Sequence, residues 1–544
     1  MKKKMLMLLL SISLCMQGCG AVEDVPQDEI PVQESVSTEV ETPAPEATEE
    51  PEAVTPDVQP TATPESTEAP ADSAPASDYL EVSFDYYYDS YFDGTSLMYG
   101  HFNTINLQTA DYPLLTKAVE EYNTLRVIEL QAYLDSIKDT AISEYKEYGA
   151  EGFMGPYSWE GDMSVRRADS KVLSVLEECY DYSGGAHGYS YFDCVNFNVQ
   201  TGEEIALEDV VTDMDSLPKI LEKELTEKYP DTTFFTEPLS DALDDYISSD
   251  NPLYQELLKF TWTLDYEGVT FYFGSYEIAS YVEGVQQATI SYSEYPDILE
   301  EKYFSHIPSD YVLKLNDSRL RSDVDLDRDG VTDYIDVMRI YEHDMYMSDA
   351  YEVEVNGNAF RQDKYCYELD TYLVKADGKN YLYIQSTADS DWKSVDVYEI
   401  TTTSVEYMGS FNGNVEGIIN STEFPMVIRL DMLSTYSAEG KSCVGEDGLP
   451  VAKGGVYTIN REIIITSTVD ITAELVDESG NLLGNTYMFP SGTDFTLVTT
   501  DGETYVDVLA DDGQRGRFYT TQNWPQTING MDAQSCFEML YFAG

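Results

Sequence analysis

A sharp change of composition at residue 79 limits which part of this chain can fold. The segment 20–78 holds ten of the 22 prolines, sixteen acidic residues, no Lys or Arg and no aromatic residue. Such a segment buries too little apolar area to offset the entropy cost of ordering its backbone. We therefore predict a disordered, extended tether, whose reach is limited to roughly 3.1 Å per residue.

Residues 1–19 have the pattern of a lipoprotein signal peptide. Three lysines at 2–4 precede an apolar run of ten residues at 5–14, which is shorter than the roughly 20 residues of a membrane-spanning helix. The sequence Met-Gln-Gly-Cys that follows resembles a bacterial lipobox, whose cysteine is diacylated and becomes the mature N-terminus. Cys19 is therefore the predicted lipidation site, and simple secretion is the alternative.

The charge of the chain excludes one large class of function. The 101 Asp and Glu residues outnumber 31 Lys and Arg, which gives a formal net charge of −70. Nucleic-acid binding needs clustered positive charge and is therefore excluded. Only four His are present, which excludes a His-rich zinc site, and the G-x-S-x-G, H-E-x-x-H and C-x-x-C patterns are absent. The sequence thus favours a binding protein over an enzyme.

Two kinds of periodicity divide the folded part. Residues 79–305 mix strand alternation with helical spacing, whereas short strands separated by turns follow from residue 306 onwards. We predict an α+β domain over 79–305, a β-rich domain over 306–450 and a small barrel or sandwich over 451–544. The expected fold class is an α+β N-terminal domain followed by an all-β region, propeller-like or sandwich, with a small SH3-like barrel at its end.

The clearest single elements lie in the α+β domain. Asp111 is a candidate N-cap, and apolar residues then recur at helical spacing up to Gly149. Residues 172–182 and 189–199 are two expected strands, joined by a glycine-rich turn. Residues 260–273 also have the pattern of a strand.

Several motifs of this domain occur in the order typical of one extracellular family. These motifs are Tyr-Ser-Gly-Gly-Ala-His-Gly at 182–188, Asn-Phe-Asn at 196–198, Thr-Gly-Glu-Glu-Ile-Ala-Leu at 201–207, Val-Thr-Phe-Tyr-Phe at 269–273 and Tyr-Glu-Ile-Ala-Ser-Tyr at 276–281. On these motifs, residues 79–305 resemble the extracellular domain shared by RsiV-type anti-sigma factors and the N-terminal module of PdaC-type peptidoglycan deacetylases. The sigma-binding segment and the deacetylase half have no counterpart here, so neither activity is carried over.

The resemblance implies an extracytoplasmic protein, and some members of the family bind lysozyme directly. We accordingly expect binding residues in the glycine-rich turn and at the start of the last motif. His187 is open to two other interpretations, a catalytic base or a residue without function in a tight turn. The expected binding residues are Gly184, Gly185, His187, Gly188 and Tyr276.

Tyrosine is abundant, with 44 residues in the chain. The run 84–92 contains six aromatic residues and two aspartates. Flat rings beside negative charge suit the recognition of glycans or of basic proteins. The alternative is that alternate tyrosines fill one face of a strand.

The twelve residues 325–336 follow the pattern of a calcium loop. Carboxylates occupy positions 1, 3, 5, 9 and 12, with glycine at position 6 and a backbone carbonyl at position 7. A strand pattern follows, so the loop resembles those of FG-GAP β-propeller repeats more than a helix-loop-helix EF-hand. We predict a structural Ca²⁺, against a merely solvated acidic turn. The predicted ligands are Asp325, Asp327, Asp329, Val331, Asp333 and Asp336.

Five cysteines remain after the signal peptide and Cys19, an odd number for an oxidising compartment. Cys179 and Cys194 are equidistant from the middle of the glycine-rich turn. A symmetric hairpin places their Cβ atoms about 4.5–5.5 Å apart, and this predicts a disulfide. At least one of the other three stays free or pairs with another molecule; these are Cys366, Cys443 and Cys536.

Together these patterns predict a lipid-anchored protein on the outer face of a bacterial cytoplasmic membrane. Its expected partner is a basic extracellular protein, because 85 acidic residues oppose 28 basic ones from residue 79 onwards, or else a cell-wall glycan. The resemblance implies that the basic protein is of lysozyme type. Contact with the membrane is expected through the lipid anchor only. The alternative function is a hydrolase of peptidoglycan or glycan, or an accessory module of such an enzyme.

Overall fold

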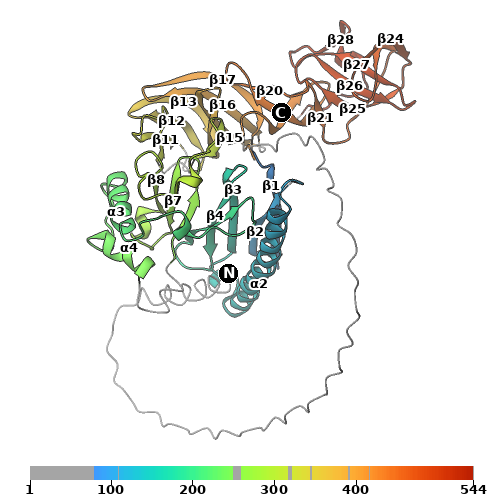
Figure 1. Ribbon diagram of the computed structural model, residues 1–544. Coiled ribbons are helices and arrows are strands. Elements are labelled where there is room, and N and C mark those ends of the chain that lie inside the picture. The colour runs from blue at the N-terminus through green and yellow to red at the C-terminus, as the bar shows by residue number, and fades with distance from the viewer. Residues whose placement is uncertain are drawn as a thin grey trace, which may run out of the picture. The chain divides into compact units, whose positions relative to one another are not determined.

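The computed structural model confirms the predicted fold class, because a mixed helical and stranded region precedes a region made of strands (Figure 1). The predicted signal peptide, Cys19 and the tether lie outside the described residues. Within the described part of the chain, no helix combines the length and apolar character needed to cross a membrane. The described residues are 79–107, 109–248, 259–315, 321–343, 346–389, 392–415, 417–418 and 420–542.

A five-stranded sheet opens the folded region, with its strands in chain order from one edge to the other. Its neighbouring strands are antiparallel except β2 and β3, which are parallel because a long helix connects them. The predicted strands 172–182 and 189–199 are confirmed as β4 and β5 to within one residue. The strands are β1 (Val82–Phe92), β2 (Ser96–Leu107), β3 (Tyr157–Ala168), β4 (Val172–Tyr182) and β5 (Tyr189–Asn198).

Helix α2 (Pro113–Gly152) packs against β2 and β3 (Figure 1). Its N-cap is Tyr112, without a side-chain capping bond, so the expected cap at Asp111 is wrong by one residue. The reason is the proline that begins the helix, because its fixed φ suits the first helical position. Gly149 has a φ of 68° and interrupts the helix one turn before its end.

A three-stranded sheet and two helices form the second layer of the mixed region. The predicted strand 260–273 is instead a hairpin, with its turn at 265–267 between β6 and β7. Leu221 and Leu225 of α3 lie in one buried cluster with Phe271 and Ile290 of this sheet. The elements are α3 (Leu217–Lys228), α4 (Leu239–Ser248), β6 (Thr261–Leu264), β7 (Gly268–Phe273) and β8 (Gln286–Ser291), with short 3₁₀ helices at Leu207–Asp209, Tyr281–Glu283 and Glu301–Tyr303.

The second half of the chain begins with a four-stranded antiparallel sheet that carries the acidic loop. Val337 and Val353 lie opposite each other in its central strands and contribute to a buried cluster. The loop at 325–332 joins the first two strands. The strands are β10 (Ser322–Val324), β11 (Asp333–Ile340), β12 (Ser348–Val355) and β13 (Asn358–Cys366).

A fifteen-stranded antiparallel ladder forms most of the rest. It continues across the domain boundary predicted at residue 450, because β21 pairs with both β19 and β25. Its strands are β9 (Tyr311–Lys314), β14 (Glu368–Ala376), β15 (Lys379–Ala388), β16 (Trp392–Thr401), β17 (Ser404–Asn414), β18 (Phe424–Asp431), β19 (Thr435–Val444), β20 (Pro450–Ala452), β21 (Tyr457–Ile459), β22 (Ile464–Thr466), β23 (Ile471–Val476), β24 (Leu482–Phe489), β25 (Asp494–Thr500), β26 (Tyr505–Ala510) and β27 (Arg515–Tyr519), followed by β28 (Thr527–Ile528), β29 (Met531–Asp532) and α6 (Ala533–Cys536).

Candidate functional site

The turn between β4 and β5 owes its shape to its glycines. Gly184 and Gly185 have φ of 97° and 99°, in the left-handed region that favours glycine. A Cβ added at Gly188 would lie 2.3 Å from the ring of Tyr180. These predicted binding residues therefore act through the backbone, and they leave the side chain of His187 exposed.

His187 stacks on two tyrosines from a loop about ninety residues downstream. Its ring centroid lies 3.8 Å from that of Tyr281, with an angle of 17° between the planes. The hydroxyl of Tyr276 lies 3.2 Å from Nε2 of His187. Tyr276 and Tyr281 are 46% and 36% exposed. These three residues, called the aromatic cluster below, present flat contact area that loses little entropy on binding.

A half-buried carboxylate fixes the loop that carries the two tyrosines. Glu277 accepts hydrogen bonds from the backbone N–H of Gly274 at 2.6 Å and from the hydroxyl of Tyr246 at 2.7 Å. Burial raises the pKa of Glu277. Tyr276 has a φ of 63°, which is uncommon outside glycine and persists only where the surroundings hold it. The loop is therefore a fixed element of the surface.

The structure thus brings the five predicted binding residues to one place, from two motifs distant in sequence. Sequence analysis missed Tyr281, which closes the same motif that Tyr276 opens. The available signal was that motif itself, because its two tyrosines stand five residues apart on either side of a buried Ile-Ala pair. Whether these residues bind a partner stays a prediction.

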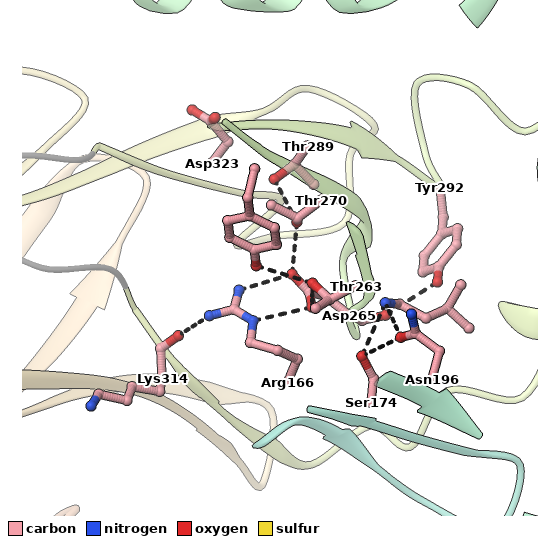
Figure 2. A network of polar contacts seen from close by, with 12 residues as sticks. Arg166, Ser174, Asn196, Thr263, Asp265, Thr270, Thr289, Tyr292, Lys314 and Asp323 are labelled. Carbon is pink, nitrogen blue, oxygen red and sulfur yellow. Dashed lines mark hydrogen bonds and ion pairs between the residues drawn. The ribbon is translucent and has the colours of Figure 1, made fainter. Parts of the chain in front are cut away.

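A buried ion pair joins the five-stranded sheet to the three-stranded sheet. The guanidinium of Arg166 donates to the carboxylate of Asp265 at 3.1 and 2.8 Å and to the carbonyl of Lys314 at 2.6 Å (Figure 2). The hydroxyls of Thr263 and Thr270 donate to the same carboxylate at 2.8 and 2.7 Å. Removal of one partner of such a pair strongly destabilises the fold, because the other charge stays buried without its partner.

Two polar residues of the same sheet face hold the backbone of β6. Ser174 and Asn196 lie opposite each other in β4 and β5. The backbone N–H of Leu264 donates to both side-chain oxygens at 3.1 Å (Figure 2). The Asn196 amide donates to the carbonyl of Trp262 at 3.0 Å. This part of the five-stranded sheet, called the covered part below, is therefore closed by β6. Nothing in the sequence pattern singled out these residues.

Three of the six predicted calcium ligands lie together in the acidic loop. Carboxylate oxygens of Asp325, Asp327 and Asp333 lie within 4.8 Å of one another. The backbone N–H of Gly330 donates to Asp325 at 3.0 Å, and the Asn356 amide donates to Asp333 at 2.6 Å. These bonds orient two of the three carboxylates. The cluster offers the hard oxygen ligands that Ca²⁺ prefers.

The other predicted ligands lie outside this cluster of carboxylates. Asp329 accepts a hydrogen bond from the backbone N–H of Val331 at 2.8 Å and so closes the turn. Asp336 stands within β11, opposite Glu354. Burial raises the pKa of Asp336, and the charge of Glu354 adds to the increase. Asp336 lies outside the cluster because β11 begins at Asp333, so that position 12 of the predicted loop stands within a strand.

A cavity of about 300 Å³ adjoins the acidic loop. Asp325 and Gly330 contribute to its wall, and α3 contributes Glu227 and Lys228. The Lys228 ammonium lies 2.7 Å from the carboxylate of Asp323, and burial lowers its pKa. The cavity gives solvent and small ions a path to one side of the loop.

The predicted disulfide between Cys179 and Cys194 is wrong. The register places Cys179 opposite Tyr191 and Cys194 opposite Leu176. An offset of three residues directs the two side chains to opposite faces of the sheet, beyond the reach of a disulfide. The prediction assumed a turn centred between the two cysteines, whereas the strand pairing is centred on Gly185.

The remaining cysteines form no disulfide among the residues that the structure describes. Cys366 and Cys536 are buried, and burial raises the pKa of both thiols. A protonated, buried thiol is a poor nucleophile. Cys443 is half-buried.

Comparisons with known proteins identify part of the mixed region. Residues 208–293 match the model of a family described as "Protein of unknown function (DUF3298)". This segment is similar to DUF3298 domains. It contains α3, α4 and the three-stranded sheet, and thus the Tyr276 and Tyr281 of the aromatic cluster. The resemblance to the RsiV-like family is not confirmed by these comparisons.

Solved structures of DUF3298 proteins are also similar to this chain. One, from Bacteroides fragilis, has 19% sequence identity and a TM-score of 0.31, and the match covers 41% of this chain and 95% of the other. Another, from Pseudomonas aeruginosa, has 16% identity and a TM-score of 0.28, with 42% and 98% covered. No curated protein matches the chain.

Proposed function

We propose that this protein is a lipid-anchored binding protein on the outer face of a bacterial cytoplasmic membrane, and that it recognises a basic extracellular protein of lysozyme type. The observation that carries the proposal is the aromatic cluster. Its exposed rings, drawn from two motifs, stand on a fixed loop and a glycine-shaped turn. Exposed, rigid aromatic residues are the usual anchors of protein interfaces.

The charge of the chain supports a basic partner. From residue 79 onwards, 85 acidic residues oppose 28 basic ones. Such an excess attracts a cationic protein from a distance and raises its association rate. The aromatic cluster then supplies contacts at short range, which do not fade with salt as the long-range attraction does.

The anchor rests on Cys19 of the lipobox-like sequence. Replacement of Cys19 by Ala should abolish lipid labelling and move the protein from the membrane fraction to the soluble fraction. Persistent membrane association of Cys19→Ala would refute the anchor.

The acidic loop is proposed to hold a structural Ca²⁺. Three carboxylates within 4.8 Å repel one another by at least about 3.5 kcal/mol for each pair at an effective dielectric constant of about 20. Among the described residues, no Lys or Arg side chain forms an ion pair with Asp325, Asp327 or Asp333. A divalent cation removes this repulsion. The Val331 carbonyl predicted as a ligand, and water, would complete the six to eight oxygens of calcium.

A substitution in the aromatic cluster tests the proposed binding function. In the full chain, Tyr281→Ala should raise the Kd for lysozyme about tenfold or more, because it removes the ring that stacks on His187. Tyr365 is 62% exposed on β13 and provides the matched control. Equal Kd values for wild type, Tyr281→Ala and Tyr365→Ala would contradict the proposal. A peptidoglycan zymogram separates it from the alternative of a cell-wall hydrolase, because a binding protein leaves the substrate intact.

A further inference from the structure

A row of side chains crosses the five-stranded sheet on the face opposite α2 and leads to the aromatic cluster. Each strand contributes one residue, and each residue lies directly opposite the next, so all point to the same face. With strands about 4.8 Å apart, the row is roughly 19 Å long. It consists of Tyr88, His101, Glu160, Tyr180 and Ser190.

Tyr180 connects this row to the aromatic cluster. Its ring lies against Gly188 of the turn. Burial raises the pKa of Tyr180, and the nearby Tyr281 and Glu160 add to the increase. Because Tyr180 lies opposite Glu160 and beside Gly188 of the turn, the row adjoins the aromatic cluster.

The adjacent row adds a further ring and more carboxylates. Tyr86 stands two residues from Tyr88 and therefore on the same face, and its ring centroid lies 5.2 Å from that of His101. Asp162 lies opposite Glu178 and 3.1 Å from Nε2 of His101. None of these residues is a Lys or an Arg. The sheet face, as named below, comprises Tyr86, Tyr88, His101, Glu160, Asp162, Glu178 and Tyr180.

The sheet face is accessible where it lies farthest from β6. Tyr86 and Tyr88 are 59% and 60% exposed, and the side chain of Asp162 is 70% exposed. Both tyrosines stand on β1, which is the edge strand of the sheet. Exposed aromatic residues in contiguous groups are typical of interaction surfaces.

We propose that the sheet face extends the aromatic cluster into one interaction surface and receives Lys and Arg side chains of the basic partner. This inference rests on the proposed function. Ring faces attract ammonium and guanidinium groups, and carboxylates form charge-assisted hydrogen bonds with them. A stable interface buries about 800 Å² on each partner. An aromatic residue buries at most about 250 Å², so three partly exposed rings alone do not reach that area.

The test combines two substitutions on the edge strand of the full chain. Tyr86→Ala with Tyr88→Ala should raise the Kd for lysozyme about tenfold or more at near-physiological salt. The control is Tyr365→Ala, which removes a tyrosine of similar exposure from β13 and should leave the Kd unchanged. Circular dichroism checks that the variants are folded. We expect them to fold, because the replaced side chains are exposed.

A second variant tests the carboxylates. Glu160→Gln with Glu178→Gln should lower the association rate at low salt several-fold, because it removes negative charge from the contact surface. Glu120 is exposed on α2, on the other side of the sheet, and Glu120→Gln should have a smaller effect.

The outcomes separate this inference from the function on which it rests. If Tyr281→Ala weakens lysozyme binding while the variant with Tyr86→Ala and Tyr88→Ala keeps its Kd within about twofold, the sheet face is not part of the interface and the proposed function stands. If the wild-type chain binds lysozyme no better than it binds cytochrome c, both proposals fail.

Discussion

One face of the five-stranded sheet has two parts with opposite character. In the covered part, Arg166 is hydrogen-bonded to Asp265 and to a carbonyl, and β6 excludes solvent. On the sheet face, Tyr86 and Tyr88 remain more than half exposed beside carboxylates. The covered part satisfies its charges within the chain. The sheet face leaves its two tyrosine rings on the edge strand open to cations from outside.

The same contrast separates the acidic loop from the buried ion pairs. Asp265 is paired with Arg166, and Asp169 with Arg167, in each case with both side chains at most 5% exposed. The three carboxylates that cluster in the acidic loop form no such pair within the described part of the chain. Carboxylates that the chain does not neutralise itself therefore indicate where an external cation is expected.

The largest effect is expected in the covered part. Arg166→Ala should lower the free energy of unfolding by about 3–5 kcal/mol, because Asp265 then keeps a buried charge without its partner. Lys117→Ala removes an exposed pair on α2 and should cost less than about 1 kcal/mol. Chemical denaturation measures both. Equal losses would remove the distinction between the covered part and the surface.

The acidic loop should give the next largest effect. At a calcium concentration 100-fold above Kd, binding to the folded state alone adds about 2.7 kcal/mol to the free energy of unfolding. Asp325→Ala with Asp327→Ala should abolish this increment, which thermal melts with calcium and with chelator detect. Asp336→Ala is the matched control and should retain it, because Asp336 lies outside the cluster. A wild-type melting temperature that is the same with calcium and with chelator would refute the site.

A smaller, pH-dependent effect is expected at His101 on the sheet face. The hydrogen bond with Asp162 raises the pKa of His101 in the folded state. The interaction of protonated His101 with Asp162 therefore stabilises the folded state fully below the ordinary His pKa of about 6.5. This stabilisation is lost as the pH rises through the raised pKa of the folded state. Asp162→Asn should lower the free energy of unfolding at pH 5 by up to about 1 kcal/mol, and by less at pH 8. Equal losses at both pH values would contradict this assignment.

The smallest effect on stability is expected at the exposed tyrosines. Tyr88→Ala should change the free energy of unfolding by no more than about 0.5 kcal/mol, because the side chain is 60% exposed. A loss of several kcal/mol in denaturation would assign Tyr88 to folding rather than to binding.

Elements and sites encoded by neighbouring residues were predictable from the sequence. The bounds of β4 and β5 follow from periodicity to within one residue. The acidic loop was predictable as well, because its three clustered aspartates lie within nine residues and a glycine with a φ of 86° shapes the turn. Two predicted carboxylate ligands were missed: Asp329 closes the turn instead, and the place of Asp336 depends on where β11 starts.

Features that depend on strand register or on contacts between distant segments were not predictable. The register of the β4–β5 hairpin follows from the conformation of its glycines, and a small shift of its centre moved Cys179 and Cys194 to opposite faces. The contact of His187 with Tyr281 and the pair of Arg166 with Asp265 both join strands or loops about a hundred residues apart. Periodicity contains no information on such contacts.

The central claim is that the aromatic cluster recognises a basic protein beyond general charge attraction. The most direct test measures binding of the full chain to lysozyme at low and at near-physiological salt, beside cytochrome c as an equally basic protein. We predict that lysozyme binding persists at about 0.15 M ionic strength, where the screening length falls to about 8 Å, while cytochrome c binding is lost. Equal binding of both proteins, vanishing together as the salt rises, would contradict the claim.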